Sequence, residues 1–252
     1  MSFAVPPDAY ARFMGRFSVP LAVEFIELVD PPARAHVLDV GCGPGALTAL
    51  LVERLGVGAI SAIDPSEPFV AAVRERFPDL DVRQSVAERL PYPDAAFDMT
   101  LAQLVVHFMA DPVAALREMG RVTRPGGLVA ASVWDYGNDR APISLFWRAV
   151  RDLEPSSTGE AHLAGTRDGH LVELFAAAGL EAAQGVLTIR TSFASFDEWW
   201  EPFTLGVGPA GVYVAGLDAE QRAELRRRCA ALLPDVPFEL EACAWVATAR
   251  IP

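Results

Sequence analysis

The chain has 252 residues, of which 52% are hydrophobic and 21% are charged, and its formal net charge is −12. This length and apolar content allow a large core and exclude wholesale disorder. The negative charge would repel nucleic-acid backbones and anionic membranes, so we expect a small molecule or another protein as partner. All 21 basic residues are arginine. Chemistry that needs a lysine amine, such as a pyridoxal-phosphate Schiff base, is therefore excluded.

The cysteines and the N-terminal residues indicate a cellular compartment. Cys42, Cys229 and Cys243 are widely spaced and form no C-x-x-C pair. They predict free thiols in a cytoplasmic protein, without a disulfide framework or a zinc site. The first eight residues lack the basic and apolar regions of a signal peptide, and no apolar run is long enough to span a membrane.

Strand and helix patterns alternate along most of the chain. The first helix is predicted at residues 19–29, with Ser18 as its N-cap and Pro31-Pro32 after its end. The expected strands are residues 36–40, 59–63, 80–84, 97–106, 127–134, about 182–191 and about 238–250. The expected later helices are residues 46–55, 68–77, 112–122, 143–153, 169–178 and 219–233. This alternation predicts βαβ units around a parallel sheet, with the ligand at the carboxyl ends of the strands.

The most informative segment is residues 37–45, VLDVGCGPG, which reads as a buried strand that ends in a glycine-rich turn. A helical pattern follows at once, so the turn places its amides at a helix N-terminus. The spacing is G-x-G-x-G, not the dinucleotide spacing G-x-G-x-x-G. Asp39 would repel a pyrophosphate beside this turn but would attract an ammonium or sulfonium group. The segment resembles motif I of the class I S-adenosylmethionine (SAM)-dependent methyltransferases, in particular their type 11, UbiE-like, small-molecule group.

Further segments resemble the same family in the same order. Asp64-Pro65 ends the second strand, residues 85–92 (SVAERLPY) match the loop after the third, and Gln103 lies near the end of the fourth. Asp64 would accept hydrogen bonds from both ribose hydroxyls, although a capping role before Glu67 is the alternative. The resemblance implies SAM as cofactor, S-adenosylhomocysteine as product, and cofactor contacts from Asp39, Gly41, Cys42, Gly43, Asp64, Pro65, Ala87, Glu88, Gln103 and Arg16.

The resemblance also implies the fold class and the domain organisation. We expect an α/β, Rossmann-like, doubly wound sheet of seven strands, with the last strand antiparallel and inserted before the sixth, and with helical lid insertions. One domain would span residues 1–252. Its parts would be an N-terminal lid (1–33), the cofactor-binding core (34–135), two substrate-lid insertions (136–165 and 193–216) and the C-terminal part of the sheet (166–192 and 217–252).

The residues for methyl transfer are harder to assign. His107 follows the fourth strand and is the candidate general base, although it could instead line the pocket without moving a proton. Asp135, Asn138 and Asp139 could bind a cation but also read as a polar turn, so no metal is expected. Glycine-rich residues 206–211 read as a hinge or turn with no helix after them. Seven aromatic residues form an apolar substrate pocket or the core beneath the lid: Trp147, Phe193, Phe196, Trp199, Trp200, Phe203 and Tyr213.

The sequence supports one leading function and two alternatives. The leading function is methyl transfer from SAM to an oxygen, nitrogen or carbon atom of a small molecule, aromatic or lipophilic in character. An NAD(P)-dependent oxidoreductase would use the same ribose-binding acid but a different glycine spacing. A SAM-binding module without catalysis is the other alternative. We expect a monomer or a homodimer.

Overall fold

Within residues 6–252, which the computed structural model describes, seven strands form one sheet in the order β3-β2-β1-β4-β5-β7-β6. The strands are β1 (Val37–Val40), β2 (Ile60–Asp64), β3 (Asp81–Gln84), β4 (Phe97–Gln103), β5 (Thr123–Trp134), β6 (Ala182–Phe193) and β7 (Phe238–Arg250). β1 to β5 pair in parallel, whereas β7 is antiparallel to both β5 and β6. The predicted doubly wound sheet with its inserted antiparallel last strand is confirmed.

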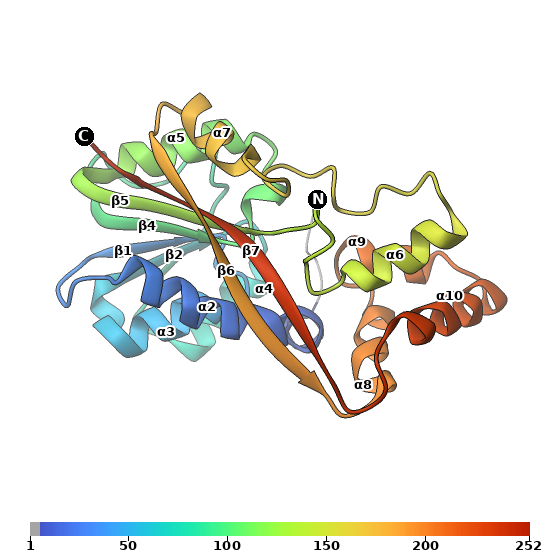
Figure 1. Cartoon of the computed structure of the whole chain (residues 1–252). Coiled ribbons are helices and arrows are strands. Elements are labelled where there is room, and N and C mark those ends of the chain that lie inside the picture. The colour runs from blue at the N-terminus through green and yellow to red at the C-terminus, as the bar shows by residue number, and fades with distance from the viewer. Residues whose placement is uncertain (1–5) are drawn as a thin grey trace.

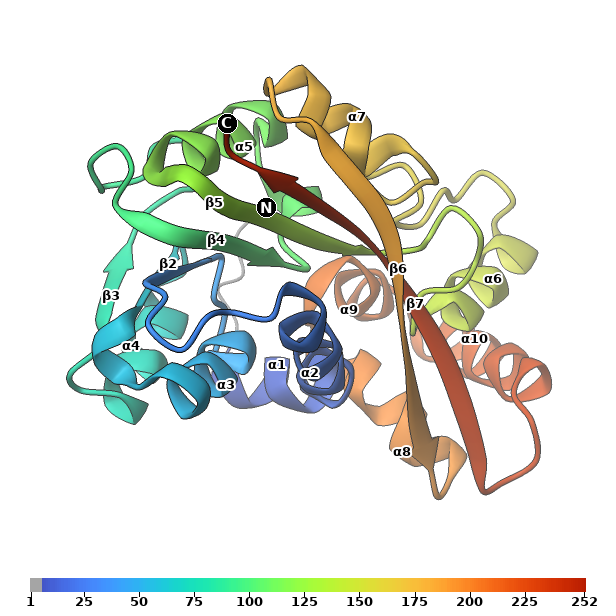
Figure 2. The same cartoon turned by 60° about the vertical axis from the view of Figure 1, so that its left-hand side comes forward.

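Helices cover both faces of the sheet. Those of the described residues are α1 (Pro7–Tyr10), α2 (Arg16–Val29), α3 (Ala46–Leu55), α4 (Glu67–Arg76), α5 (Pro112–Val122), α6 (Ser144–Leu153), α7 (His170–Ala177), α8 (Phe196–Trp200), α9 (Gly208–Ala215) and α10 (Ala219–Leu232). α2, α3 and α4 lie on one face, and α5 and α7 lie on the other (Figures 1 and 2). The buried apolar residues accordingly form two clusters, one for each face of the sheet.

The start of the first long helix differs from the one predicted from the sequence. Ser18 is not an N-cap, because a π-helical turn at Ala11–Gly15 leads directly into α2, which begins at Arg16. The physical reason is that Phe13, Phe17 and Leu21 follow one another at four-residue spacing and are all buried. The apolar face of the helix therefore starts before Ser18. Residues 1–5, which include most of the segment without a signal-peptide pattern, lie outside the described residues.

The fourth strand ends three residues earlier than predicted. β4 stops at Gln103, and Leu104 takes a left-handed backbone conformation with φ of +59°. Such a conformation is strained for a leucine and cannot continue a strand. Val106–Phe108 then forms a 3-10 turn. The break turns His107 away from the strand direction and into the loop beyond the sheet.

The second half of the chain builds a helical cover beyond the end of the sheet. β6 and β7 form a long antiparallel pair that extends past β5, and α6, α8, α9 and α10 gather around its far end (Figure 1). The prediction that no helix follows residues 206–211 is wrong, because α9 begins at Gly208 with Pro209 in its first turn, where proline is tolerated. Trp147, Phe193, Trp199, Trp200 and Phe203 are buried in the core, which is the second of the two alternatives given for the aromatic group.

Candidate functional site

The glycine-rich turn after β1 has the backbone conformation that its composition predicts. Gly41, Gly43 and Gly45 have φ values of +72°, +54° and +90°, which favour glycine. A Cβ at position 41 would overlap the side chain of Val105, whereas a Cβ at position 43 would meet nothing within 4 Å. Gly41 is thus required by packing, and Gly43 faces open space where a ligand can approach the backbone.

Asp64 fastens this turn to the end of β2. Its Oδ2 accepts a hydrogen bond of 2.9 Å from the Gly43 amide, and its Oδ1 accepts one of 2.8 Å from the Ser66 amide. The residue at the N-cap of α4 is Ser66, so the alternative of Asp64 as helix cap is wrong. Burial raises the pKa of Asp64. A carboxylate has about four acceptor positions, so Asp64 can still accept from two ribose hydroxyls.

Asp39 lies at the buried centre of the same region. The side chain is 1% exposed and accepts a hydrogen bond of 2.6 Å from the Thr48 hydroxyl in α3. Burial raises the pKa of Asp39 to about 7, and the Thr48 hydrogen bond opposes that shift. Since Asp64 also raises this pKa through its charge, the two carboxylates form an anionic region beside the glycine turn. A cationic ligand would stabilise their ionised forms.

These residues border a cavity at the carboxyl ends of β1 and β4, which we call the donor cavity. It is lined by Tyr10, Ser18, Asp39, Gly41, Cys42, Gly43, Pro44, Ala46, Leu47, Gln103 and Leu104. Gln103 Nε2 donates to the Ser18 carbonyl at 2.9 Å, which ties α2 over the cavity. Gln103 Oε1 is buried and has no hydrogen-bond partner within residues 6–252. Anionic side chains and a free acceptor atom suit the ammonium group of SAM.

Five of the predicted cofactor residues line the donor cavity directly, and a sixth, Asp64, is hydrogen-bonded to the Gly43 amide in its wall. Arg16 is turned away: its guanidinium forms a 2.9 Å ion pair with Glu198 and stacks 4.6 Å from the centre of the Phe193 ring. The Pro65 carbonyl accepts from Gln84. A cofactor contact from Arg16 stays a prediction that this arrangement does not support.

Ala87 and Glu88 belong to the loop after β3, residues 85–94. Glu88 Oε1 accepts from the amides of Ala110 and Asp111, at 2.8 and 3.2 Å, and so joins this loop to the start of α5. Ala87 is buried. Glu88 thus holds in place the loop from which the resemblance implies cofactor contacts.

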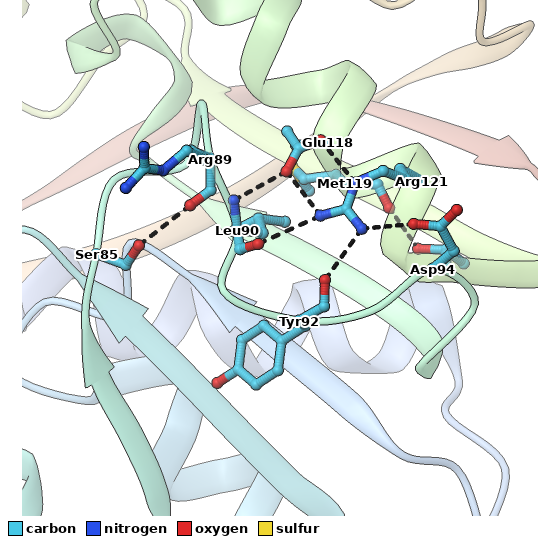
Figure 3. A network of polar contacts seen from close by, with 9 residues as sticks. Ser85, Arg89, Leu90, Tyr92, Asp94, Glu118, Met119 and Arg121 are labelled. Carbon is cyan, nitrogen blue, oxygen red and sulfur yellow. Dashed lines mark hydrogen bonds and ion pairs between the residues drawn. The ribbon is translucent and has the colours of Figure 1, made fainter.

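A polar network fixes the rest of that loop to α5 (Figure 3). Arg121 donates to the carbonyls of Leu90 and Tyr92 and pairs with Asp94 and Glu118, at 2.7 Å in each pair. Glu118 in turn accepts from the Leu90 amide at 2.9 Å. The hydrogen bonds from Arg121 lower the pKa of Glu118, so both groups stay charged.

A second cavity adjoins the first, and we call it the acceptor cavity. It is lined by Tyr10, Phe13, Met14, Leu104, His107, Phe108, Trp134, Tyr136, Ile143, Glu160, Val207, Gly208 and Pro209. Tyr10 and Leu104 line both cavities. Residues from the N-terminal helices, from the ends of β4 and β5 and from both predicted lid insertions thus meet at one place.

His107 lies in the wall of the acceptor cavity. It is 6% exposed, and its Nδ1 has no hydrogen-bond partner in the described part of the chain. Burial lowers the pKa of His107 to about 3. The imidazole is therefore neutral at physiological pH, and it can accept a hydrogen bond although it is a weak proton acceptor.

Trp134, Tyr136 and Glu160 also line the acceptor cavity, and sequence reasoning did not single them out. Trp134 ends a predicted strand, and Glu160 lies in a Ser/Thr/Gly-rich stretch without periodicity. Glu160 could have been noticed as a titratable residue in an insertion at the carboxyl end of the sheet. Many acids on a protein surface meet the same description, so the sequence alone does not distinguish it.

Residues 135–140 form a polar turn. Asp135 is fully buried and accepts from Arg140 Nε at 2.6 Å and from both nitrogens of Asn138 at 3.1 Å. Across residues 6–252, no group of three or more His, Cys, Asp or Glu side chains is placed to hold a metal ion. Both carboxylate oxygens of Asp135 thus accept hydrogen bonds from within the protein.

The chain is similar to known methyltransferases over part of its length. Residues 38–131 match a family model described as a methyltransferase domain. An uncharacterized methyltransferase of Mycobacterium tuberculosis is 37% identical over 153 residues, 61% of this chain and 57% of the relative. A trans-aconitate 2-methyltransferase of Methylobacterium nodulans is 30% identical over 191 residues, 75% of this chain and 64% of the relative. The alignments thus span less than two thirds of these relatives.

Solved structures share the fold over nearly the whole chain. A SAM-dependent methyltransferase from Thermotoga maritima superposes with a TM-score of 0.58 at 16% identity, covering 97% of this chain and 94% of that one. This likeness shows the fold, and the family match identifies residues 38–131 as a methyltransferase domain. None of the helices among residues 6–252 has the length and apolarity needed to cross a membrane.

Proposed function

We propose that this protein transfers a methyl group from SAM to a small molecule bound in the acceptor cavity. The observation that carries the proposal is the shared wall, because Tyr10 and Leu104 each border both cavities. A donor in one cavity and an acceptor in the other would be held side by side, and such positioning is worth roughly 7–11 kcal/mol of the barrier. SAM supplies a methyl group that its sulfonium has already activated.

The residues of the donor cavity fit this cofactor. Asp64 would accept from the ribose hydroxyls, and Asp39 would provide negative charge near the cationic end of SAM. Gly41, Cys42 and Gly43 present backbone next to that space, and Gln103 offers its unpartnered Oε1. The loop with Ala87 and Glu88 would border the adenine. S-adenosylhomocysteine would leave from the same contacts.

The acceptor cavity favours an aromatic or lipophilic substrate. Its described lining is mostly aromatic and aliphatic, and it contains no arginine. His107 is neutral because burial lowers its pKa to about 3. The relative from M. nodulans is named for trans-aconitate, a molecule with three carboxylates. Such an anion would lack a positive partner in this lining, so we propose a different acceptor class for this chain.

His107 could serve as general base, as its position after β4 suggests. A base works best when its pKa lies near the working pH. At a pKa of about 3, His107 is better suited to accept a hydrogen bond from the acceptor than to remove its proton. We therefore propose His107 as a residue that orients the acceptor.

Calorimetry with SAM, S-adenosylhomocysteine and NADH tests the cofactor. We expect both sulfur ligands to bind and NADH not to bind, and the opposite pattern would establish the oxidoreductase alternative. A screen of small molecules, read out by release of S-adenosylhomocysteine, then separates catalysis from simple SAM binding. Tight SAM binding with no turnover on any aromatic or lipophilic compound would favour the non-catalytic module.

We also propose a cytoplasmic protein that works as a monomer or a homodimer. The three cysteines are buried free thiols, which suit a reducing compartment. Light scattering coupled to gel filtration measures the oligomeric state. A tetramer or a larger species would contradict this expectation.

A further inference from the structure

A buried acid, Glu160, lies in the acceptor cavity and has no role in the scheme above. It belongs to the segment between α6 and α7, yet only 3% of the residue is exposed. Its Oε2 accepts a 2.8 Å hydrogen bond from the indole Nε1 of Trp147. The Tyr136 hydroxyl also bonds to the carboxyl group. The loop is thus folded back so that its acid reaches the cavity wall.

The surroundings of Glu160 leave its charge uncompensated. Burial raises the pKa of Glu160 to about 7, and the two groups that oppose this shift, Trp147 and Tyr136, are neutral donors. A buried carboxylate is costly unless a cation or several donors surround it. Two neutral donors leave acceptor positions unused, since a carboxylate offers about four. A ligand with its own donor or positive charge would satisfy them.

Two further polar atoms of the same wall lack partners. Trp134 Nε1 and His107 Nδ1 are both buried without a hydrogen-bond partner among residues 6–252. Of the two, only His107 Nδ1 can accept a hydrogen bond from a donor group on a ligand, because the indole nitrogen is a donor only. Around them the lining is apolar and aromatic, including Phe13 and Phe108. Aromatic rings with one carboxylate form a surrounding that attracts ammonium groups. The same surrounding repels a carboxylate.

We propose that Glu160 selects the methyl acceptor by binding a donor group on it, an ammonium or, less strongly, a hydroxyl, attached to an aromatic or aliphatic body. This inference rests on the proposed function only in assigning the cavity to the acceptor. Glu160 acts here as a specificity residue that holds the substrate, and Tyr136 and Trp147 position its carboxyl group.

Three probes with the same phenyl ring and different end groups test the inference: 2-phenylethylamine, 2-phenylethanol and 3-phenylpropionate. Binding to the full chain is measured by calorimetry at pH 8, where Glu160 is ionised and the amine is protonated. S-adenosylhomocysteine is present at saturation. We expect the amine to bind most tightly, the alcohol more weakly and the acid not at all.

The substitution Glu160→Gln keeps the shape and an acceptor oxygen for Trp147 but removes the charge. We expect it to weaken amine binding by about tenfold or more, because a charged hydrogen bond is worth about 1.5–3 kcal/mol, while alcohol binding changes less. Glu154→Gln is the matched control. Glu154 lies in the same segment, is exposed and accepts only a long 3.4 Å hydrogen bond from Tyr213. It should leave all three affinities unchanged.

Several results would overturn the proposal. They are equal amine affinity in the wild type and Glu160→Gln, preference of the wild type for 3-phenylpropionate, or no binding of any probe. A melting scan of each variant shows whether it is folded, and Tyr136→Phe gives a second test, with a smaller loss of amine affinity expected. Failure of the proposed function would look different, because it would appear as no binding of SAM and S-adenosylhomocysteine, whereas the probes report on Glu160 directly.

Discussion

The Gly43 amide donates a 2.9 Å hydrogen bond to the Asp64 carboxylate, and this contact joins the turn after β1 to the end of β2. The same acid therefore has two tasks, because it shapes the turn and offers acceptor positions to a ribose. Substitutions of Asp64 that remove one or both of these tasks should therefore reduce SAM affinity to different extents.

Asp64→Ala removes both tasks at once. We expect SAM affinity to fall by about tenfold or more, since two hydrogen bonds to a charged group are lost. Asp64→Asn keeps one oxygen for the Gly43 amide and should retain more affinity. Calorimetry gives both values. Unchanged affinity in Asp64→Ala would show that the ribose binds elsewhere.

The pH dependence of SAM binding should reveal Asp39. Its pKa is about 7 in the ligand-free protein, so below that pH the carboxyl group takes up a proton and loses its attraction for a cation. SAM affinity is expected to fall as the pH is lowered from 8 to 5.5, and Asp39→Asn should make this dependence weaker.

The variant Thr48→Val is a second test of the role of Asp39 in the pH dependence of SAM binding. It removes the 2.6 Å hydrogen bond that lowers the pKa of Asp39, at nearly constant volume. The midpoint of the pH dependence should then move upward. A midpoint that stays in place would mean that another group titrates.

The stability of the ligand-free protein should also depend on pH. Asp39 and Glu160 both have a pKa near 7 when folded, against ordinary values near 4. Between about pH 4.5 and 7 the folded protein retains protons that the unfolded chain releases. The free energy of unfolding therefore decreases as the pH rises, by up to about 1.4 kcal/mol per pH unit for each group.

Urea unfolding of the wild type and Glu160→Gln at pH 5, 6 and 7 measures this effect. The variant should lose less stability over the range, because one of the two groups no longer titrates. Parallel curves for the two proteins would assign the slope to other residues.

Arg121→Ala should loosen the loop of residues 85–94, which borders the expected adenine site. Its contacts to Leu90, Tyr92 and Asp94 are lost together. Arg89 is exposed in this loop, so trypsin should cleave after it faster, and SAM affinity should fall severalfold. Arg117→Ala, which removes only a 3.4 Å bond to Ala177, is the control. Equal cleavage in both variants would contradict the role of the network.

His107→Asn tests orientation against proton removal. An asparagine keeps hydrogen-bonding atoms but cannot act as a base, so an orienting His107 predicts a partial loss of kcat, below about 10²-fold, with SAM affinity unchanged. Burial lowers the pKa of His107 to about 3, so its own titration should not appear in the rate between pH 5 and 9. A greater loss, with a rate that titrates near pH 6.5 only in the wild type, would restore His107 as general base.

The donor cavity was predictable because its residues are set by local pattern. Gly41, Gly43 and Asp39 belong to one short strand and turn, and Asp64 ends the next strand, so the parallel sheet brings them to the same edge. The acceptor cavity was not predictable in this way. Trp134 ends β5, whereas Tyr136 and Glu160 come from an insertion without periodicity, and only the packing of the helical cover brings the three together. Arg16 shows the converse, since Glu198, far along the chain, pairs with it.

The long antiparallel pair of β6 and β7 has a consequence for how this protein can be altered. Phe193 and Phe238 are register partners, and their rings stack with centroids 5.1 Å apart, where β6 ends and β7 begins. Residues 194–237, which contain α8, α9 and α10, therefore leave the sheet after Phe193 and return to it at Phe238. These two stacked residues lie side by side. A relative's segment joined at these two phenylalanines would exchange one wall of the acceptor cavity and leave the donor turn intact, which makes 194–237 a natural unit for building chimeric enzymes.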